Sequence, residues 1–274
     1  MKEMDIALIG KGRWGQNYIK TIPGLIVKTR DYSEILGRED IEGVIIASAT
    51  DTHFKIARDF IEKGFNVLIE KPITKTYAEA LELQKLHRKN KKQIVMAGHI
   101  QIYDPGYQEL KRNLVKIGIV KNLIFKGSQD QARTDSTVLE NWGPHPIYMF
   151  MDLLNTSPKS VKGQERGKDN LQLDFDFDDK ITATAYIGTF SPERKREFTV
   201  VGERGKLTLD WAGEKTLTLT RPDNQKTSLK FSQEKSPLEA EITEFIECIR
   251  IGKKPKTPLS QGVEVARILD LCRN

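Results

Sequence analysis

The stretch IALIGKGRWGQNYIKTIPGLIVKTRDY, residues 6–32, decides the fold because it begins like a dinucleotide-binding unit. The apolar run at residues 5–9 is typical of a buried parallel strand, and residues 14–21 can form a helix. Between them, the pattern G-x-G-x-x-G is formed by Gly10, Gly12 and Gly15. The first glycine permits a tight turn, the second lets backbone approach a pyrophosphate, and the third lets the helix pack against the strand. The loop therefore predicts a dinucleotide site.

Strands and helices then alternate regularly along the chain. Apolar runs at 43–48, 66–70 and 93–98 predict buried strands, and apolar residues at helical spacing predict helices at 53–63 and about 77–90. Such alternation implies right-handed crossovers and a parallel sheet that is covered on both faces. In this doubly wound plan, ligands bind at the carboxyl ends of the strands.

After about residue 120 the pattern changes to alternating strands separated by turn residues. The clearest hairpin signal is GERG at residues 202–205. Two helices are predicted to close the chain, at about 237–251 and 260–273. The second half is therefore predicted to be a mostly antiparallel sheet with helices against it.

These patterns predict an α/β protein with two domains. Residues 1–98 form a Rossmann-like dinucleotide-binding domain, and residues 99–274 form an α+β domain that binds substrate and mediates oligomerisation. The exposed face of the large antiparallel sheet is expected to be partly apolar and to pair with another copy. A homodimer or homotetramer follows from this expectation.

The composition is that of a soluble globular protein. The chain has 274 residues, of which 38% are hydrophobic and 30% charged, so two domains can each bury a core. No apolar run approaches the roughly 18 residues of a membrane span, and residues 1–10 lack signal-peptide features, so we expect a cytoplasmic protein. The two cysteines lie far apart and the four histidines are not clustered, which predicts neither disulfides nor a metal site.

The net charge of +6 is spread along the whole chain. A spread of this kind favours a solvated surface over binding to nucleic acid. It also favours anionic small molecules, such as a dinucleotide or a phosphorylated sugar, as ligands.

Five later segments carry a resemblance to a known family: IASATDTH at 46–53, EKP at 70–72, AGHIQIYDPGYQEL at 97–110, NWGPHPIYMFMDLL at 141–154 and PLEAEITEFIECIRIGKKP at 237–255. With the glycine loop, their order and spacing resemble the Gfo/Idh/MocA oxidoreductases over nearly the whole chain. The resemblance implies an NAD(P)-dependent enzyme that moves hydride to or from a ring carbon of a sugar, cyclitol or nucleotide-linked sugar. The segment FSPERKREFTVVGERGKLTLDW at 190–211 resembles members that oxidise nucleotide-linked sugars.

The candidate catalytic residues are Lys71, His145 and Asn141. Lys71 follows a buried strand and is fixed by the next residue, a proline, so it should point into the ligand crevice. The resemblance implies that Lys71 holds the reacting hydroxyl and that His145 is the acid-base group. Relatives commonly have aspartate where this chain has Asn141, which can hydrogen-bond but cannot take a proton. Glu140 is adjacent, but on an extended chain it should face the other way.

The candidate contacts to NAD or NADP come from the glycine loop and from the ends of two later strands. They are Gly10, Gly12, Arg13, Trp14, Gly15, Ser48, Ala49, Thr50, His53, Glu70 and Lys71. Two alternatives remain open. One is a non-catalytic dinucleotide or sugar-nucleotide binding protein, and the other is a reductase of a different carbonyl or imine, for which His145 would be dispensable.

The partner of the adenosine ribose is also open. An acidic residue usually follows the glycine loop by about 20 positions, and Asp31 lies 21 positions after Gly10. However, VKTRDYSEIL resembles a later family segment that leads into the next helix, and only 38 positions separate Gly15 from His53. This favours deletion of the strand that carries the ribose acid. Lys28 and Arg30 would then favour phosphate.

Overall fold

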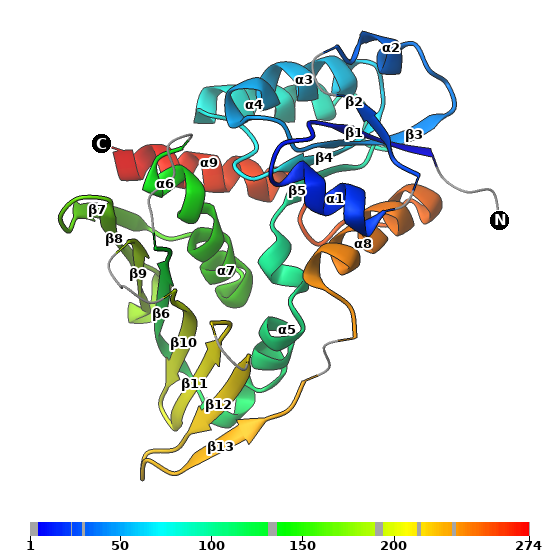
Figure 1. Cartoon of the computed structure of the whole chain (residues 1–274). Coiled ribbons are helices and arrows are strands. Elements are labelled where there is room, and N and C mark those ends of the chain that lie inside the picture. Colours follow the sequence, from blue (N-terminus) through cyan, green and yellow to red (C-terminus); the bar gives the residue numbers. More distant parts are fainter. Residues whose placement is uncertain are drawn as a thin grey trace. The chain divides into compact units, whose positions relative to one another are not determined.

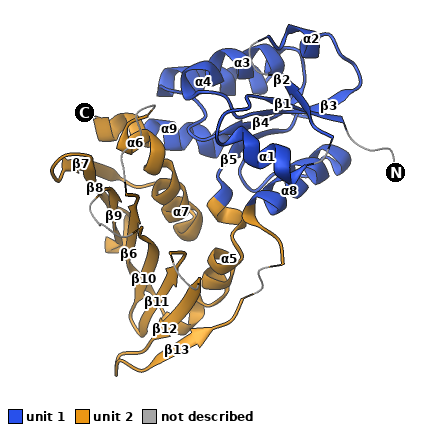
Figure 2. Ribbon diagram, viewed as in Figure 1, with its two compact units in different colours: residues 1–100, 238–267 blue, residues 101–237, 268–274 orange. Residues whose placement is uncertain are grey.

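The computed structural model describes residues 5–22, 24–28, 31–130, 136–189, 194–212, 215–231 and 234–273. The chain divides into two compact units, residues 1–100 with 238–267, and residues 101–237 with 268–274 (Figure 2). The closing helices are α8 (Pro237–Ile251) and α9 (Leu259–Arg273). We had assigned both helices to the second domain, but nearly all of α8 and most of α9 belong to the first unit.

The first unit contains a five-stranded parallel sheet (Figure 1). Its order is β2-β1-β3-β4-β5, and its strands are β1 (Asp5–Ile9), β2 (Ile26–Lys28), β3 (Ile41–Ile46), β4 (Asn66–Glu70) and β5 (Val95–Gly98). The helices along the same segment are α1 (Gly15–Thr21), α2 (Ser33–Leu36), α3 (Thr50–Glu62) and α4 (Tyr77–His87). The predicted Rossmann-like fold is confirmed for this unit.

Helices cover both faces of this sheet. On one face, α3, α4 and α9 share a buried cluster with the strands, to which α9 contributes Leu259, Val263 and Ala266. The other face lies against α8, because a side chain at Gly43 would meet Phe245 and Ile249 of that helix. Packing between segments so distant in sequence leaves no periodic signal, which is why the closing helices were assigned to the wrong unit.

The edge strand β2 corrects the deletion hypothesis. It pairs in parallel with β1, from Ala7 opposite Ile26 to Ile9 opposite Lys28. In the common six-stranded order 3-2-1-4-5-6, the strand beside β1 carries the ribose acid and a further strand lies outside it. Here the inner strand is present with three residues, and no strand lies outside it among the described residues. Asp31 follows β2 and is exposed, whereas Arg30 lies outside the described residues.

The second unit contains an eight-stranded sheet in the order β13-β12-β11-β10-β6-β9-β8-β7 (Figure 1). Its strands are β6 (Val120–Ser128), β7 (Ser160–Glu165), β8 (Asn170–Asp176), β9 (Thr182–Gly188), β10 (Arg196–Gly202), β11 (Gly205–Asp210), β12 (Thr216–Thr220) and β13 (Lys226–Leu229). All neighbouring pairs are antiparallel except β6 with β9, so the predicted, mostly antiparallel sheet is confirmed. The GERG hairpin is confirmed too, since Gly202 pairs with Gly205 across the turn.

Helices cover one face of the second sheet. They are α5 (Pro105–Arg112), α6 (Val138–Trp142) and α7 (Pro144–Leu154), and the segments 100–103, 114–117 and 178–180 are short 3₁₀ helices. The covered face is apolar, as the ring contacts of Phe150 with Phe175 and Phe198 illustrate. The opposite face is mainly polar, with hydrogen bonds such as Thr199 to Thr208 and Thr184 to Asp174. No helix in the described ranges is both long and apolar enough to cross a membrane.

Candidate functional site

The glycine loop has the geometry that its motif requires. Gly10 has a φ of 107°, and a Cβ there would lie 2.6 Å from the backbone nitrogen of Ser48. A Cβ on Gly15 would overlap the carbonyl oxygen of Gly10. Gly12 differs, because it is exposed and no atom lies within 4 Å of the position that its Cβ would take. The protein itself therefore requires the outer two glycines, while the middle one faces open space that a pyrophosphate can enter.

The carboxyl end of β3 lies beside this loop. Ser48 follows the strand, Ala49 caps α3, and Thr50 begins that helix. The hydroxyls of Ser48 and Thr52 are 2.7 Å apart, which holds the turn together. The predicted contact residues Ser48, Ala49 and Thr50 are partly or fully exposed at this strand end.

His53 is held inside the fold. Its side chain is 1% exposed, with Nδ1 2.9 Å from the carbonyl oxygen of Pro72 and Nε2 3.1 Å from that of Ser48. Burial lowers the pKa of His53, although the carbonyl partners oppose this shift. A neutral imidazole has one N–H and can donate to only one of the two carbonyls. The structure thus places His53 as a link between two loops, and its predicted contact with the cofactor stays a prediction.

Glu70 connects the glycine loop with the strand end that bears Lys71. Its carboxylate accepts hydrogen bonds from Trp14 Nε1, from the Tyr18 hydroxyl at 2.7 Å and from the backbone nitrogen of Lys71 at 3.1 Å. Gly98 makes room for it, since a Cβ there would lie 3.3 Å from Glu70 Oε2. Burial raises the pKa of Glu70 above its usual value, and its hydrogen bonds and the charge of Lys71 only partly offset this shift. Three donors converge on Glu70, which favours its ionised form.

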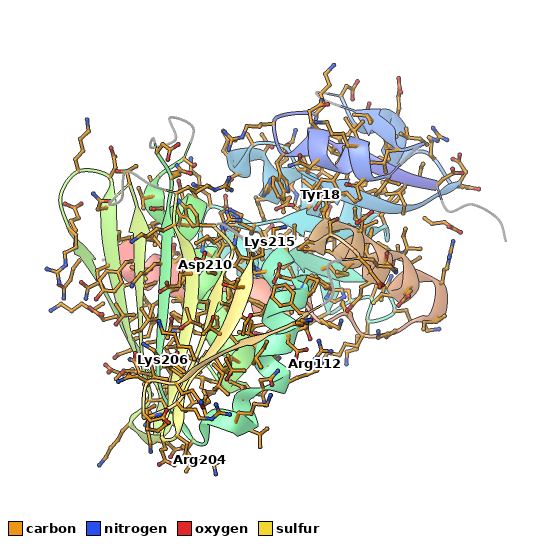
Figure 3. The ribbon with its side chains drawn as sticks, turned by 60° about the horizontal axis from the view of Figure 1, so that its bottom comes forward. Tyr18, Arg112, Arg204, Lys206, Asp210 and Lys215 are labelled. Atoms are coloured by element: carbon orange, nitrogen blue, oxygen red, sulfur yellow. The ribbon has the colours of Figure 1, made fainter. Side chains whose placement is uncertain are left out.

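Behind Glu70 lies a second buried carboxyl group, that of Glu241 on α8. Its Oε2 is 3.5 Å from the Tyr18 hydroxyl, and its Oε1 has no hydrogen-bond partner among the described residues. Burial and the nearby Glu70 raise the pKa of Glu241 well above its usual range. Tyr18 has one hydroxyl proton, and the shorter distance assigns it to Glu70. The raised pKa therefore favours the neutral form of Glu241, whose neighbour Tyr18 is labelled in Figure 3.

Sequence reasoning missed Tyr18 and Glu241. Tyr18 lies in the helix after the glycine loop. The sequence predicted this helix but gave its residues no role of their own. Glu241 carried a signal, because it shares the apolar face of α8 with Leu238, Ile242 and Phe245, all of them buried. An acidic residue on such a face is rarely buried without a partner.

His99 is a further buried group near Lys71. It follows β5 and is 2% exposed. Burial and the charge of Lys71 lower the pKa of His99 to about 3. His99 is therefore neutral at physiological pH, and it adds no charge beside the half-buried Lys71.

In the second unit, His145 lies in the first turn of α7. It is 7% exposed, and its ring packs edge-on against Trp142 with 6.0 Å between centroids. Asn141 donates a long hydrogen bond of 3.4 Å to Gln129. Asn141 and Trp142 also line a small pocket together with Gln129, Thr137 and Thr189.

Glu140 corrects a detail of the sequence analysis. Residues 138–142 form α6, so the expectation of an extended chain there was wrong. Glu140 accepts hydrogen bonds from the backbone nitrogen and hydroxyl of Thr137 at the start of this helix, and it pairs with Arg273 at 3.5 Å. Its carboxylate is thus engaged in helix capping.

Comparisons with known proteins agree with this geometry. Residues 22–99 match the Gfo/Idh/MocA model, which is described as an oxidoreductase family with an NAD-binding Rossmann fold. The inositol 2-dehydrogenase of Salmonella typhimurium is 32% identical over 141 residues, which cover 48% of this chain and 41% of that protein. The chain therefore matches less than half the length of this relative.

Two solved structures resemble the whole chain. An oxidoreductase structure from Magnetospirillum magnetotacticum has a TM-score of 0.89 at 26% identity, and the match covers 99% of this chain and 100% of that one. The UDP-N-acetylglucosamine 3-dehydrogenase of Acidithiobacillus ferrooxidans has a TM-score of 0.88 at 18% identity, with 100% of this chain and 97% of that one covered. At this identity the second likeness shows the fold alone.

The glycine loop, the parallel sheet and the family match define an NAD(P)-binding Rossmann fold of the class found in oxidoreductases. Within that class, the family that residues 22–99 match is Gfo/Idh/MocA. The family resemblance and the prediction of a nicotinamide dinucleotide cofactor, NAD or NADP, are confirmed at this level.

Proposed function

We propose that this protein moves hydride between NAD(P) and a ring carbon that bears a hydroxyl or keto group in a sugar, a cyclitol or a nucleotide-linked sugar. The attachment of Lys71 to the glycine loop through Glu70 carries the proposal. Because of it, the dinucleotide loop and the lysine-bearing strand end form one hydrogen-bonded assembly. A lysine fastened in this way suits a reaction at the nicotinamide.

The two candidate catalytic side chains have separate roles in this proposal. Lys71 donates a hydrogen bond to the reacting oxygen, and His145 takes or returns the hydroxyl proton, as the family resemblance implies. Imidazole titrates near neutral pH and therefore suits an acid-base group. Hydride transfer is the chemistry of the nicotinamide, and the protein supplies position and proton transfer. Asn141 contributes a hydrogen bond to the substrate and no charge.

Asp31 is proposed as the partner of the adenosine ribose. It follows β2, which pairs with β1 in the position that the acid-bearing strand takes in doubly wound sheets. Its Oδ1 accepts a hydrogen bond of 2.9 Å from the backbone nitrogen of Ser33. That bond fixes the carboxylate at the carboxyl end of the strand, where the ribose of a dinucleotide lies.

The variant Lys71→Ala tests the proposal. We expect turnover to fall by about 10²–10⁴-fold, because a group that acts on the reacting oxygen is lost. The affinity for NADH should change little, since the hydrogen bond from residue 71 to Glu70 uses its backbone nitrogen. Turnover is measured by nicotinamide absorbance with myo-inositol, glucose and UDP-N-acetylglucosamine. Lys75→Ala, at an exposed lysine on the same loop, is the matched control. Retained turnover in Lys71→Ala would reject the role.

Asn141 motivates the second candidate function, that of a non-catalytic dinucleotide or sugar-nucleotide binding protein. A carboxylate at this position would stabilise an imidazolium, and an amide does not. This candidate predicts binding of NADH without turnover of any substrate in the panel. The variant Asn141→Asp separates the two functions, because it should raise the turnover of an enzyme and leave a binding protein inactive.

We also propose that the protein forms a homodimer or homotetramer through the uncovered face of the eight-stranded sheet. This face carries Tyr186, which is 38% exposed, among threonines and charged residues. Light scattering of the purified protein measures the assembly. Thr184→Arg places a bulky charge on the face and should shift the mass toward the monomer, while an unchanged mass would exclude this interface.

A further inference from the structure

Two buried nitrogen donors in the second unit lack an acceptor. Neither Arg196 Nε nor Trp142 Nε1 has a hydrogen-bond partner among the described residues. The Trp142 side chain is only 4% exposed. Buried donors in folded proteins almost always have an acceptor, and an exception calls for an explanation such as a missing ligand.

The two donors belong to side chains that touch. The guanidinium carbon of Arg196 lies 5.2 Å from the ring centroid of Trp142, in cation–π contact. Trp142 rests on the bare backbone of Gly127, because a Cβ there would lie 2.5 Å from its ring. Gly127 is also the strand partner of Arg196 across β6 and β10. The Arg196–Trp142 pair therefore packs against the sheet rather than against a loop.

The backbone around Arg196 is fixed on both sides. Its carbonyl accepts a hydrogen bond of 2.8 Å from Trp211, which follows β11. On the other side, the backbone nitrogen of Ser128 donates to the carbonyl of Lys195 at 2.8 Å. Such support reduces the freedom of the guanidinium and favours a preorganised contact.

The charge of Arg196 is not matched by an ion pair among the described residues. In the part of the chain that the structure describes, no acidic residue forms an ion pair with it, and Arg194 lies close enough to oppose its charge. Burial and this neighbour lower the pKa of Arg196, and the attraction of Asp104 only partly offsets them. A largely buried cation without an ion pair destabilises a fold, so its presence suggests a partner that binds from outside.

The surroundings of the pair are those of the candidate substrate site. Trp142 contacts the ring of His145 and lines the small pocket with Asn141. The lining residues Gln129, Thr137 and Asn141 offer hydroxyl and amide groups that can hydrogen-bond to the hydroxyls of a ligand. An acceptor on such a ligand would find the donors of Arg196 and Trp142 at the edge of the same region.

We infer that Arg196 and Trp142 form a subsite for an oxyanion, a carboxylate or a phosphate, carried by the polyol substrate. The inference rests on the proposed function for the presence of a polyol near His145. Arginine suits both anions, because its planar donors match their geometry. The enzyme thus prefers an anionic sugar or sugar nucleotide over a neutral cyclitol.

Isothermal titration of the purified full-length protein tests this subsite without turnover. The probes are matched pairs: glucuronate with glucose for a carboxylate, and UDP-N-acetylglucosamine with N-acetylglucosamine for a phosphate. We expect at least one anionic member to bind roughly tenfold or more tightly than its neutral partner. The pair that shows the difference identifies the anion.

Arg196→Gln should remove this preference, and Trp142→Phe, which keeps a ring but lacks the N–H, should reduce it. Arg204→Gln is the control, since it removes the same charge at an exposed turn on the same sheet and should keep the preference (Figure 3). The melting temperature of Arg196→Gln should not fall, because a buried cation without an ion pair is removed.

Three results would overturn the inference. The first is that the wild type prefers neither anionic probe, and the second is that Arg196→Gln loses affinity equally for the anionic and the neutral member of a pair. The third is a lower melting temperature for that variant, which would mark Arg196 as structural. Absence of hydride transfer with an intact anion preference would count against the proposed function alone.

Discussion

The variant Tyr18→Phe tests the buried hydrogen bonds behind the glycine loop. The substitution removes one oxygen and keeps the ring, so it creates almost no cavity in a fully buried position. Glu70 loses the donor at 2.7 Å but keeps those of Trp14 and Lys71. Glu241 loses its one hydrogen-bond partner, the hydroxyl 3.5 Å from its Oε2. The effect of the variant is thus confined to two buried carboxyl groups.

The expected loss of stability follows from these contacts. A hydrogen bond to a charged group contributes about 1.5–3 kcal/mol, and a buried polar group without a partner costs about 1–3 kcal/mol. The two terms share one hydroxyl and are not additive. We therefore expect Tyr18→Phe to lower the free energy of unfolding by about 2–4 kcal/mol.

Urea unfolding measures this loss. Trp14 is the one tryptophan of the first unit, so its fluorescence in a Trp142→Phe, Trp211→Phe background reports that unit. Tyr32→Phe is the matched control, because it removes a tyrosine hydroxyl bonded at 2.8 Å to the carboxylate of Asp59, a contact that is only partly buried. In the control, the free energy of unfolding should fall by less than about 1 kcal/mol.

Three outcomes of this comparison would contradict the roles given to the Tyr18 hydroxyl. If Tyr18→Phe and Tyr32→Phe lowered the free energy of unfolding by similar amounts, burial would not set the strength of the Tyr18 contacts. If Tyr18→Phe were as stable as the wild type, the hydroxyl would support neither Glu70 nor Glu241. A loss of stability without weaker NADH binding would show that Trp14 keeps its position without Tyr18.

Three further predictions concern the same unit. Burial raises the folded pKa of Glu241 above its unfolded value, so the wild type becomes less stable as the pH rises above about 4.3. The variant Glu241→Gln should therefore gain stability relative to the wild type over this range. Urea midpoints between pH 4 and 8 check this, and a stability difference that is constant with pH would exclude a raised pKa. Gly15→Ala should destabilise the unit through overlap with Gly10, whereas Gly12→Ala should leave its urea midpoint unchanged and weaken NADH binding in a fluorescence titration; equal stability losses would contradict the open space at Gly12. Asp31→Ala should weaken NADH binding roughly tenfold, as loss of a hydrogen bond to a charged group implies; unchanged affinity would show that β2 does not carry the ribose partner.

Much of the fold could be predicted from the sequence because its signals are local. The glycine loop, the apolar strand runs and the GERG turn each depend on neighbouring residues, and the structure confirms the elements they indicate. The edge strand β2 has three residues, too few for a periodic pattern, so its pairing with β1 could not be foreseen. Helix α6 was missed for the same reason, since it has five residues.

In the candidate site, too, residues with a local sequence signal could be predicted, and residues that depend on distant contacts could not. Lys71 and His145 could be nominated from the sequence because motifs with fixed spacing surround them, and their catalytic roles stay predictions. Tyr18 and Arg196 matter through partners distant in sequence, and no local pattern marks such residues. The motif of His53 indicates the strand end but not the direction of the ring, which tertiary contacts to Pro72 and Ser48 decide.

Glu241 shows why the first 100 residues do not form a complete dinucleotide-binding unit. Helix α8 supplies Glu241 behind the glycine loop, and its Phe245 and Ile249 cover Gly43 of the parallel sheet. Without α8, one face of that sheet would expose buried residues such as Leu8 and Ile45, whose burial contributes about 1.5–3 kcal/mol each. The doubly wound fold needs helices on both faces, and α1 alone has only seven residues. The chain therefore has to pass through the second unit before its cofactor unit can close.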